Sequence, residues 1–145
     1  MKNESFVIER TYNAPILKVW KAITDRNNIK QWYFDIAEFK PEKDFEFRFS
    51  GGTENRKYMH LCKVTEIIIG RKLTYRWRYD GYEGDSVVTY ELFEEAEKTR
   101  LKLIYIGLES FPTDNPDFAK ERFAEGWTYI IGTSLERFSE KPVPI

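Results

Sequence analysis

The sequence contains very little cysteine and histidine, and this scarcity excludes several classes of chemistry. Its 145 residues include one cysteine, Cys62, and one histidine, His60. A single cysteine cannot form an intrachain disulfide, which is typical of a protein from a reducing compartment. Two such residues cannot build a multi-histidine metal site or a structural zinc site. We therefore expect neither a metal nor a cofactor.

The net charge is also small, and long apolar runs are missing. Lys and Arg number 23 and Asp and Glu 24, so the formal net charge is −1 and attracts neither nucleic acid nor an anionic membrane. The charge-free stretch at residues 126–135 is far shorter than the ~20 residues that span a bilayer, and no signal-peptide pattern opens the chain. We expect a cytoplasmic protein without nucleic-acid partner or membrane insertion, either a monomer or a homodimer.

Aromatic residues, in contrast, are abundant. The chain has 11 Phe, 9 Tyr and 4 Trp, or 17% of its residues. Side chains of this size require a thick core, a cavity to line or a partner surface. The composition alone does not choose among these three.

The middle of the chain predicts a run of strands. Apolar and polar residues alternate with period two in several segments, which are separated by short polar or glycine-containing turns. The predicted strands cover residues 6–12, 45–49, 58–68, 73–79, 88–92 and 101–105. Because parallel pairs need long crossovers, strands joined by such short turns must form one antiparallel sheet.

Two segments have helical periodicity. Ile16, Val19, Trp20 and Ile23 share one face of a helix that follows Pro15, and residues 29–33 predict a further short turn. A longer apolar stripe runs from residue 123 to residue 138, and Pro142 ends it. Only the sheet is large enough to bury this stripe, so we predict a single α+β domain over residues 1–145, with two layers.

Several segments together resemble a known family. They are IERTYNAP at residues 8–15, VWKAITD at 19–25, QWY at 31–33, GG at 51–52, LTYRW at 73–77, TRLKL at 99–103 and GW at 126–127. In this order, over nearly the whole chain, they are similar to the activator of Hsp90 ATPase homologue-like (AHSA1-type) family of the START-like (SRPBCC, polyketide cyclase-like, Bet v 1-like) superfamily.

The resemblance implies a helix-grip fold. In this fold a curved antiparallel sheet of about six strands wraps around a long C-terminal helix, and two short helices follow the first strand. In the wider superfamily a hydrophobic cavity lies between sheet and helix. Members share no universal catalytic set, so the resemblance assigns no catalytic residue.

Strand alternation and the helical stripe then predict the cavity lining. An apolar pocket with a few polar groups is typical of a small-molecule site, and the Tyr hydroxyl and the Trp indole N–H supply such groups. The alternative, that these rings only fill the core, stays open. The cavity mouth is expected near residues 81–84 and 107–116. The predicted lining residues are Phe47, Phe49, His60, Glu66, Tyr75, Trp77, Tyr90, Tyr105, Trp127 and Ile131.

Three polar residues need separate interpretation. His60 and Cys62 lie two apart on one strand and share a face, but such neighbours are ~6.5–7 Å apart, too far for a nucleophile pair without further help. We therefore interpret Cys62 as a buried thiol. Glu66 is expected to face the cavity, where an unpaired carboxylate is costly unless it is bonded or used as an acid or base.

Three functions follow from these observations. The first is a non-enzymatic carrier or sensor of a small hydrophobic or lipid-like molecule. The second is a co-chaperone-like module with Hsp90 as partner. The third is a cyclase- or hydrolase-type enzyme. A nucleic-acid role is disfavoured because Arg76 and Arg78 alternate with Tyr75 and Trp77 and so lie on the opposite face from the rings that would stack on bases.

Overall fold

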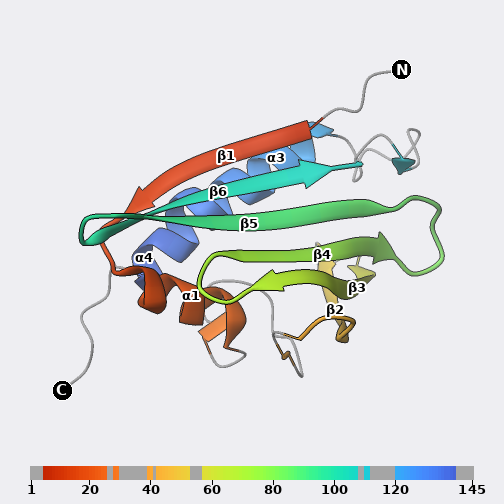
Figure 1. The fold of residues 1–145 in the computed structure, drawn as a ribbon. Coiled ribbons are helices and arrows are strands. Elements are labelled where there is room, and N and C mark those ends of the chain that lie inside the picture. Colours follow the sequence, from red (N-terminus) through yellow and green to blue (C-terminus); the bar gives the residue numbers. More distant parts are fainter. Residues whose placement is uncertain are drawn as a thin grey trace.

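A six-stranded antiparallel sheet forms one layer and helices form the other (Figure 1). This computed structural model describes residues 5–25, 28–29, 39–40, 42–52, 57–107, 110–111 and 120–139. The sheet order is β1-β6-β5-β4-β3-β2, with every neighbouring pair antiparallel. The predicted α+β class is therefore confirmed. The strands are β1 (Ser5–Tyr12), β2 (Glu46–Gly52), β3 (Lys57–Ile68), β4 (Lys72–Tyr79), β5 (Ser86–Glu95) and β6 (Lys98–Ile106).

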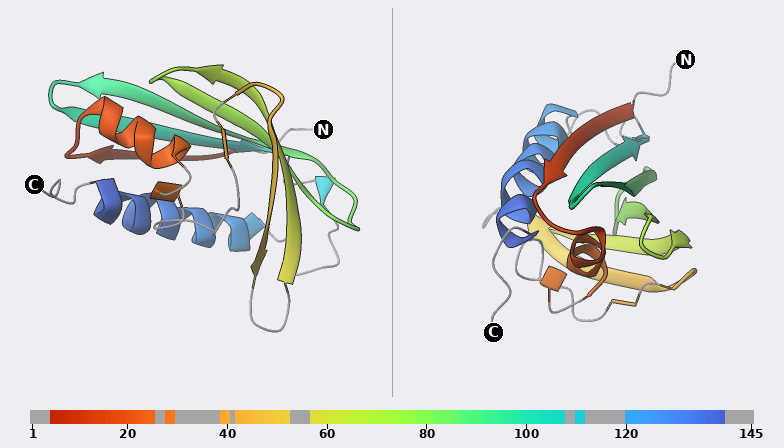
Figure 2. Two further views of the ribbon diagram at one scale, coloured as in Figure 1. Left: turned by 90° about the horizontal axis from the view of Figure 1, so that it is seen from below. Right: turned by 60° about the vertical axis from the view of Figure 1, so that its left-hand side comes forward.

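The sheet is curved and holds the C-terminal helix on one side (Figure 2). We call the face toward the helices the inner face and the opposite face the outer face. In β4, Tyr75, Trp77 and Tyr79 are buried while Arg76 and Arg78 are exposed. The alternation seen in the sequence thus decides which face of the sheet is covered by helices.

Helix α1 (Ile16–Thr24) begins directly after Pro15, as predicted. Its buried residues include Ile16, Val19, Trp20 and Ile23, which are the positions that the helical spacing selects. Residues 28–29 are also helical, but the remainder of the further short turn predicted at 29–33 lies outside the described residues.

The C-terminal helix contains a change of pitch. It consists of α3 (Lys120–Tyr129), a π-helical segment η3 (Ile130–Ser134) and α4 (Leu135–Ser139). In an α-helix, each step of four residues overshoots one turn by ~40°, so a stripe with this strict spacing drifts around the helix. The wider π turns correct this drift and return the later positions to the sheet. Buried residues recur at every fourth position: Phe123, Trp127, Ile131, Leu135 and Ser139.

The β3 strand contains a bulge that changes which residues face inward. Val64 pairs with Tyr75, but Glu66 pairs with Thr74, so Thr65 is an extra residue in β3. Before the bulge the buried positions are even-numbered, and after it Glu66 is exposed while Ile67 packs against the core. An inserted residue reverses the alternation of the strand beyond it.

Candidate ligand-binding site

The inner face carries a continuous group of buried rings, which we call the aromatic cluster. It joins strands β2 to β6 to helix α3. Nine of the ten predicted lining residues, all but Glu66, are buried, with exposed fractions of 7% or less. The aromatic cluster consists of Phe47, Phe49, His60, Tyr75, Trp77, Tyr79, Tyr90, Tyr105 and Trp127.

Strand register brings these rings together. Phe49, His60 and Tyr79 are neighbours across three strands. In the adjacent row, Trp77 lies between two small residues, Cys62 on β3 and Ser86 on β5. The small neighbours leave the large indole room to stand on the inner face. The ring centroids of Trp77 and of Trp127 on α3 are 5.7 Å apart. Trp77 therefore connects the sheet to the helix.

The indole N–H of Trp77 is the least satisfied polar group in the cluster. Trp77 is 4% exposed, and its Nε1 atom is buried without a hydrogen-bond partner in the described part of the chain. Burial raises the pKa of the adjacent Tyr79 phenol and the Trp77 N–H partly opposes this rise, but the two groups do not reach hydrogen-bonding geometry. A buried donor left unpaired costs about 1–3 kcal/mol.

Other polar tips in the cluster are bonded to one another. The hydroxyl oxygens of Tyr75 and Tyr90 are 2.8 Å apart. The Ser86 hydroxyl donates to the Trp77 carbonyl oxygen at 2.8 Å and contacts the Tyr105 hydroxyl at 3.0 Å. Burial raises the pKa of Tyr90 and Tyr105, because the phenolate would lose its hydration. These hydroxyls therefore stay neutral and serve as hydrogen-bonding groups.

His60 is held as a neutral ring inside the cluster. Its Nδ1 atom lies 3.0 Å from the Tyr58 carbonyl oxygen and 3.3 Å from that of Phe49. Carbonyl oxygens only accept, so Nδ1 carries the proton and Nε2 is the acceptor. The ring stacks on Phe49 with centroids 4.5 Å apart. Burial lowers the pKa of His60 to about 4, and the hydrogen bonds to the two carbonyl oxygens only partly oppose this effect.

The prediction that Glu66 faces the cavity is wrong. Glu66 is exposed on the outer face, and its Oε1 atom lies 2.9 Å from Lys72 Nζ. The physical reason is the β3 bulge at Thr65, which reverses the alternation on which the prediction relied. An acid–base role at this position therefore loses its structural basis.

Cys62 is buried on the same face as His60, as expected from their spacing. Burial raises the pKa of its thiol, so the thiol stays protonated and is a poor nucleophile. Among the described residues, no group of three or more His, Cys, Asp or Glu side chains is arranged to hold a metal ion.

The sequence interpretation omitted two residues that belong to the site. Tyr79 has the same strand parity as Trp77, and this signal was available from the alternation in residues 73–79. Its ring lies 4.7 Å from that of His60. Ser86 is a small polar residue at the start of a strand, and only the strand register reveals that it neighbours Trp77.

The cluster continues toward the loop at residues 80–85, where the cavity mouth was predicted. Phe111 stacks on Phe123 with centroids 5.8 Å apart and contacts Tyr79 at 5.2 Å. Gly84 has a φ of +114°, and a Cβ atom there would lie 2.5 Å from Phe111. The loop can pack this closely only with glycine. Most of the remaining predicted mouth, residues 108–109 and 112–116, lies outside the described residues.

No helix in the described ranges is both long and apolar enough to span a membrane.

Among proteins of curated function, none matches the sequence of this chain. Solved structures do match its fold. A protein from Chromobacterium violaceum is 19% identical, with a TM-score of 0.79 over 95% of this chain and 98% of its own. A Bacillus halodurans protein is 24% identical, with a TM-score of 0.75 over 97% of this chain and 100% of its own.

A third similar structure is DynU16, a protein of the dynemicin biosynthetic locus. It is 21% identical, with a TM-score of 0.76 over 97% of this chain and 48% of its own. The family model named "Activator of Hsp90 ATPase homolog 1-like protein" matches residues 13–140. With a six-stranded curved sheet around a C-terminal helix, the chain has a helix-grip fold and therefore belongs to the activator of Hsp90 ATPase homolog 1-like family.

Proposed function

We propose that the protein binds a small hydrophobic molecule carrying a hydrogen-bond acceptor, between the sheet and the C-terminal helix. It acts as a carrier or sensor and not as an enzyme. The observation that supports this proposal is the indole N–H of Trp77, which lies inside the aromatic cluster without a hydrogen-bond partner among the described residues. Small-molecule sites combine an apolar lining with a few polar groups that orient the ligand.

The chemistry of the cluster suits binding better than catalysis. Burial keeps the phenols of Tyr90 and Tyr105 and the thiol of Cys62 protonated. His60 is neutral near pH 7 because its pKa is lowered to about 4. Glu66, the carboxylate candidate for a cyclase or hydrolase role beside His60 and the tyrosines, lies on the outer face and away from the cluster. We therefore do not propose an enzymatic role.

Native mass spectrometry of the purified protein, compared with its denatured mass, tests the proposal. An extra mass of roughly a few hundred daltons that denaturation releases would support it. The uncharged dye Nile red, which carries a carbonyl acceptor, provides a second test through its fluorescence. A bare chain that also leaves Nile red dim would refute the proposal, and Trp77 Nε1 would then be satisfied by water.

Two tryptophan variants separate the indole N–H from general packing. Trp77→Phe removes the donor and should weaken Nile red binding by about tenfold, the value of one buried hydrogen bond. Trp20→Phe is the matched control, because Trp20 is also buried but belongs to α1 and makes no ring contact in the described structure. Equal losses in both variants would show that stability, and not the N–H, governs binding.

A second candidate function is interaction with an Hsp90-type chaperone. The family match supports it, as does a group of exposed apolar residues at one end of the sheet: Ile68, Ile69 and Phe93, exposed by 49%, 82% and 37%. Exposed apolar residues that gather in one place are typical of protein-binding surfaces. Purified protein should then change the ATPase rate of Hsp90, and Ile69→Ser should abolish that change without lowering stability. An unchanged ATPase rate would refute this candidate.

A further inference from the structure

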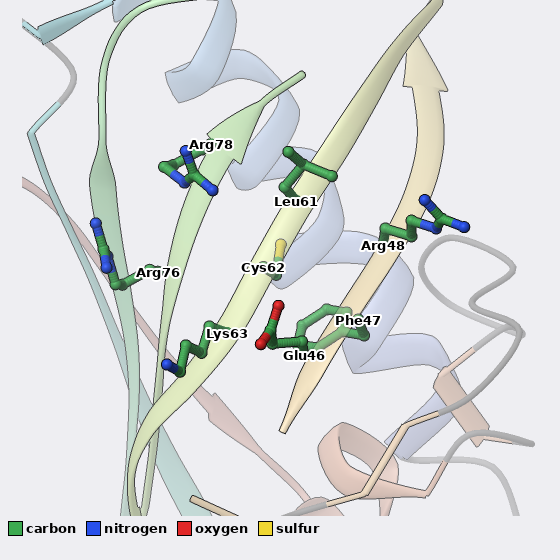
Figure 3. Close-up of a pocket in the computed structure, with 8 residues that line it drawn as sticks. All are labelled: Glu46, Phe47, Arg48, Leu61, Cys62, Lys63, Arg76 and Arg78. Atoms are coloured by element: carbon green, nitrogen blue, oxygen red, sulfur yellow. The ribbon is translucent and has the colours of Figure 1, made fainter. Parts of the chain in front are cut away.

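The outer face carries a groove that is independent of the aromatic cluster. It crosses strands β2, β3 and β4 and has a volume of about 500 Å³. Figure 3 shows the residues that line it on the three strands, with the C-terminal helix behind the sheet. Phe47 and Cys62, whose side chains are buried on the inner face, also line the groove. The outer lining residues are Glu46, Arg48, Leu61, Lys63, Arg76 and Arg78.

Among the described residues, the lining contains four cationic side chains and one carboxylate. Two of the cations have partners: Arg76 pairs with Asp85, and Lys63 lies 4.0 Å from Asp44. Arg48 and Arg78 make no ion pair within the described part of the chain. Positive charge at the groove therefore exceeds what neighbouring carboxylates neutralise.

Strand register places Arg48 and Arg78 on either side of one apolar residue. Arg48 pairs with Leu61, and Leu61 pairs with Arg78. The two arginine Cα atoms are thus separated by two strand spacings, or ~10 Å. Both side chains are exposed and flank Leu61 in Figure 3. Exposed side chains change rotamer within nanoseconds, so both guanidinium groups can close on one anion above Leu61.

We propose that this groove binds the phosphate group of a small phosphorylated molecule, held between Arg48 and Arg78. A phosphate monoester carries nearly two negative charges and three acceptor oxygens. It can therefore accept hydrogen bonds from two guanidinium groups at once better than a single carboxylate can. The groove volume is within the ~300–1,000 Å³ of small-molecule sites and leaves room for the group that carries the phosphate.

The observations favour a small molecule over a nucleic acid. Binding of single strands depends on exposed rings for base stacking, whereas Phe47, the one aromatic residue among the described lining residues, is buried on the inner face. The formal net charge of −1 also provides no long-range attraction to a polyanion. A single phosphate needs only the local charge of the groove.

Titration of ¹⁵N-labelled protein with ribose 5-phosphate tests the proposal, with ribose as the unphosphorylated comparison. Chemical-shift changes should be confined to β2, β3 and β4 and should be absent with ribose.

Arg48→Gln and Arg78→Gln should each weaken binding by about tenfold, the loss expected for a charged hydrogen bond. Arg137→Gln, an exposed arginine on α4, is the matched control and should stay within about twofold because it lies on the helix layer.

A gain-of-affinity variant keeps the test independent of folding defects. Glu46→Gln removes the one carboxylate that the described lining residues carry and should tighten binding by about threefold. Equal binding of ribose, or an equal loss in Arg137→Gln, would overturn the proposal. Tighter binding of a single-stranded oligonucleotide through the same residues would overturn the small-molecule assignment in favour of a nucleic acid.

Discussion

Acidification should destabilise this protein through His60. In the folded state the pKa of His60 is lowered to about 4 from the ordinary 6.5, because burial disfavours the charged ring. The unfolded chain therefore takes up a proton at this residue at a higher pH than the folded chain does. Folding stability is unaffected above pH 6.5 and falls as the pH is lowered from 6.5 toward 4.

The magnitude follows from the two pKa values. The full difference corresponds to about 3 kcal/mol below pH 4, and to about 2 kcal/mol already at pH 5. Most surface carboxylates are still ionised at pH 5, so this window isolates the histidine. A loss of 2 kcal/mol is a large part of the ~5–15 kcal/mol that stabilises a typical domain.

The assay is urea unfolding at pH 7.5 and pH 5.0, for the natural chain and for His60→Gln. Glutamine can still donate to the neighbouring carbonyl oxygens but does not titrate. The variant should be less stable at pH 7.5, yet it should lose about 2 kcal/mol less than the natural chain between the two pH values. The comparison between the two proteins removes the contribution of the carboxylates.

Direct titration provides an independent check. Because the chain has one histidine, its ring Hε1 proton gives a single assignable NMR signal. This signal should stay in its neutral position at pH 5.5 and begin to move only near pH 4. A midpoint near 6.5, or identical pH dependence in His60→Gln, would refute the reasoning that burial keeps the ring neutral.

Three further predictions concern stability, and urea unfolding at pH 7.5 measures each. Gly84→Ala should cost about 2–3 kcal/mol, because the new Cβ would meet Phe111 at 2.5 Å in a backbone with φ of +114°; an unchanged midpoint would show that this loop relaxes freely. Tyr12→Phe should cost about 1–2 kcal/mol, because the hydroxyl donates at 2.7 Å to the Ile131 carbonyl oxygen inside the π-helical segment; no loss would mean that water replaces the bond. Glu66→Gln should leave the midpoint unchanged, because its ion pair is exposed; a large loss would contradict its placement on the outer face.

Much of the fold is encoded in local periodicity. The alternation of Tyr75 and Trp77 with Arg76 and Arg78 predicts both a strand and its two faces, and the structure confirms both. The spacing of the apolar residues in α1 likewise predicts its buried side. Such patterns can be recognised in the sequence because the side-chain periodicity of a helix or strand determines which of its residues face the core.

The candidate site was predictable as far as the alternation continued without interruption. Phe49, His60 and Trp77 were assigned to the inner face from their parity, and they are in ring contact there. Glu66 was misassigned because one extra residue in β3 reversed the parity. A bulge depends on pairing with β4 and has no reliable local signal.

The residue pattern is enough to predict the α+β class, the inward residues of the regular strands and the length of the apolar stripe that the sheet must cover. The neighbours of these residues follow only from the way in which the elements pack together. The pitch change at Ile130–Ser134, the unpartnered N–H of Trp77 and the arginines on either side of Leu61 each arise from contacts between elements far apart in the chain. Periodicity assigns a residue to a face, whereas register and packing between elements determine its neighbours.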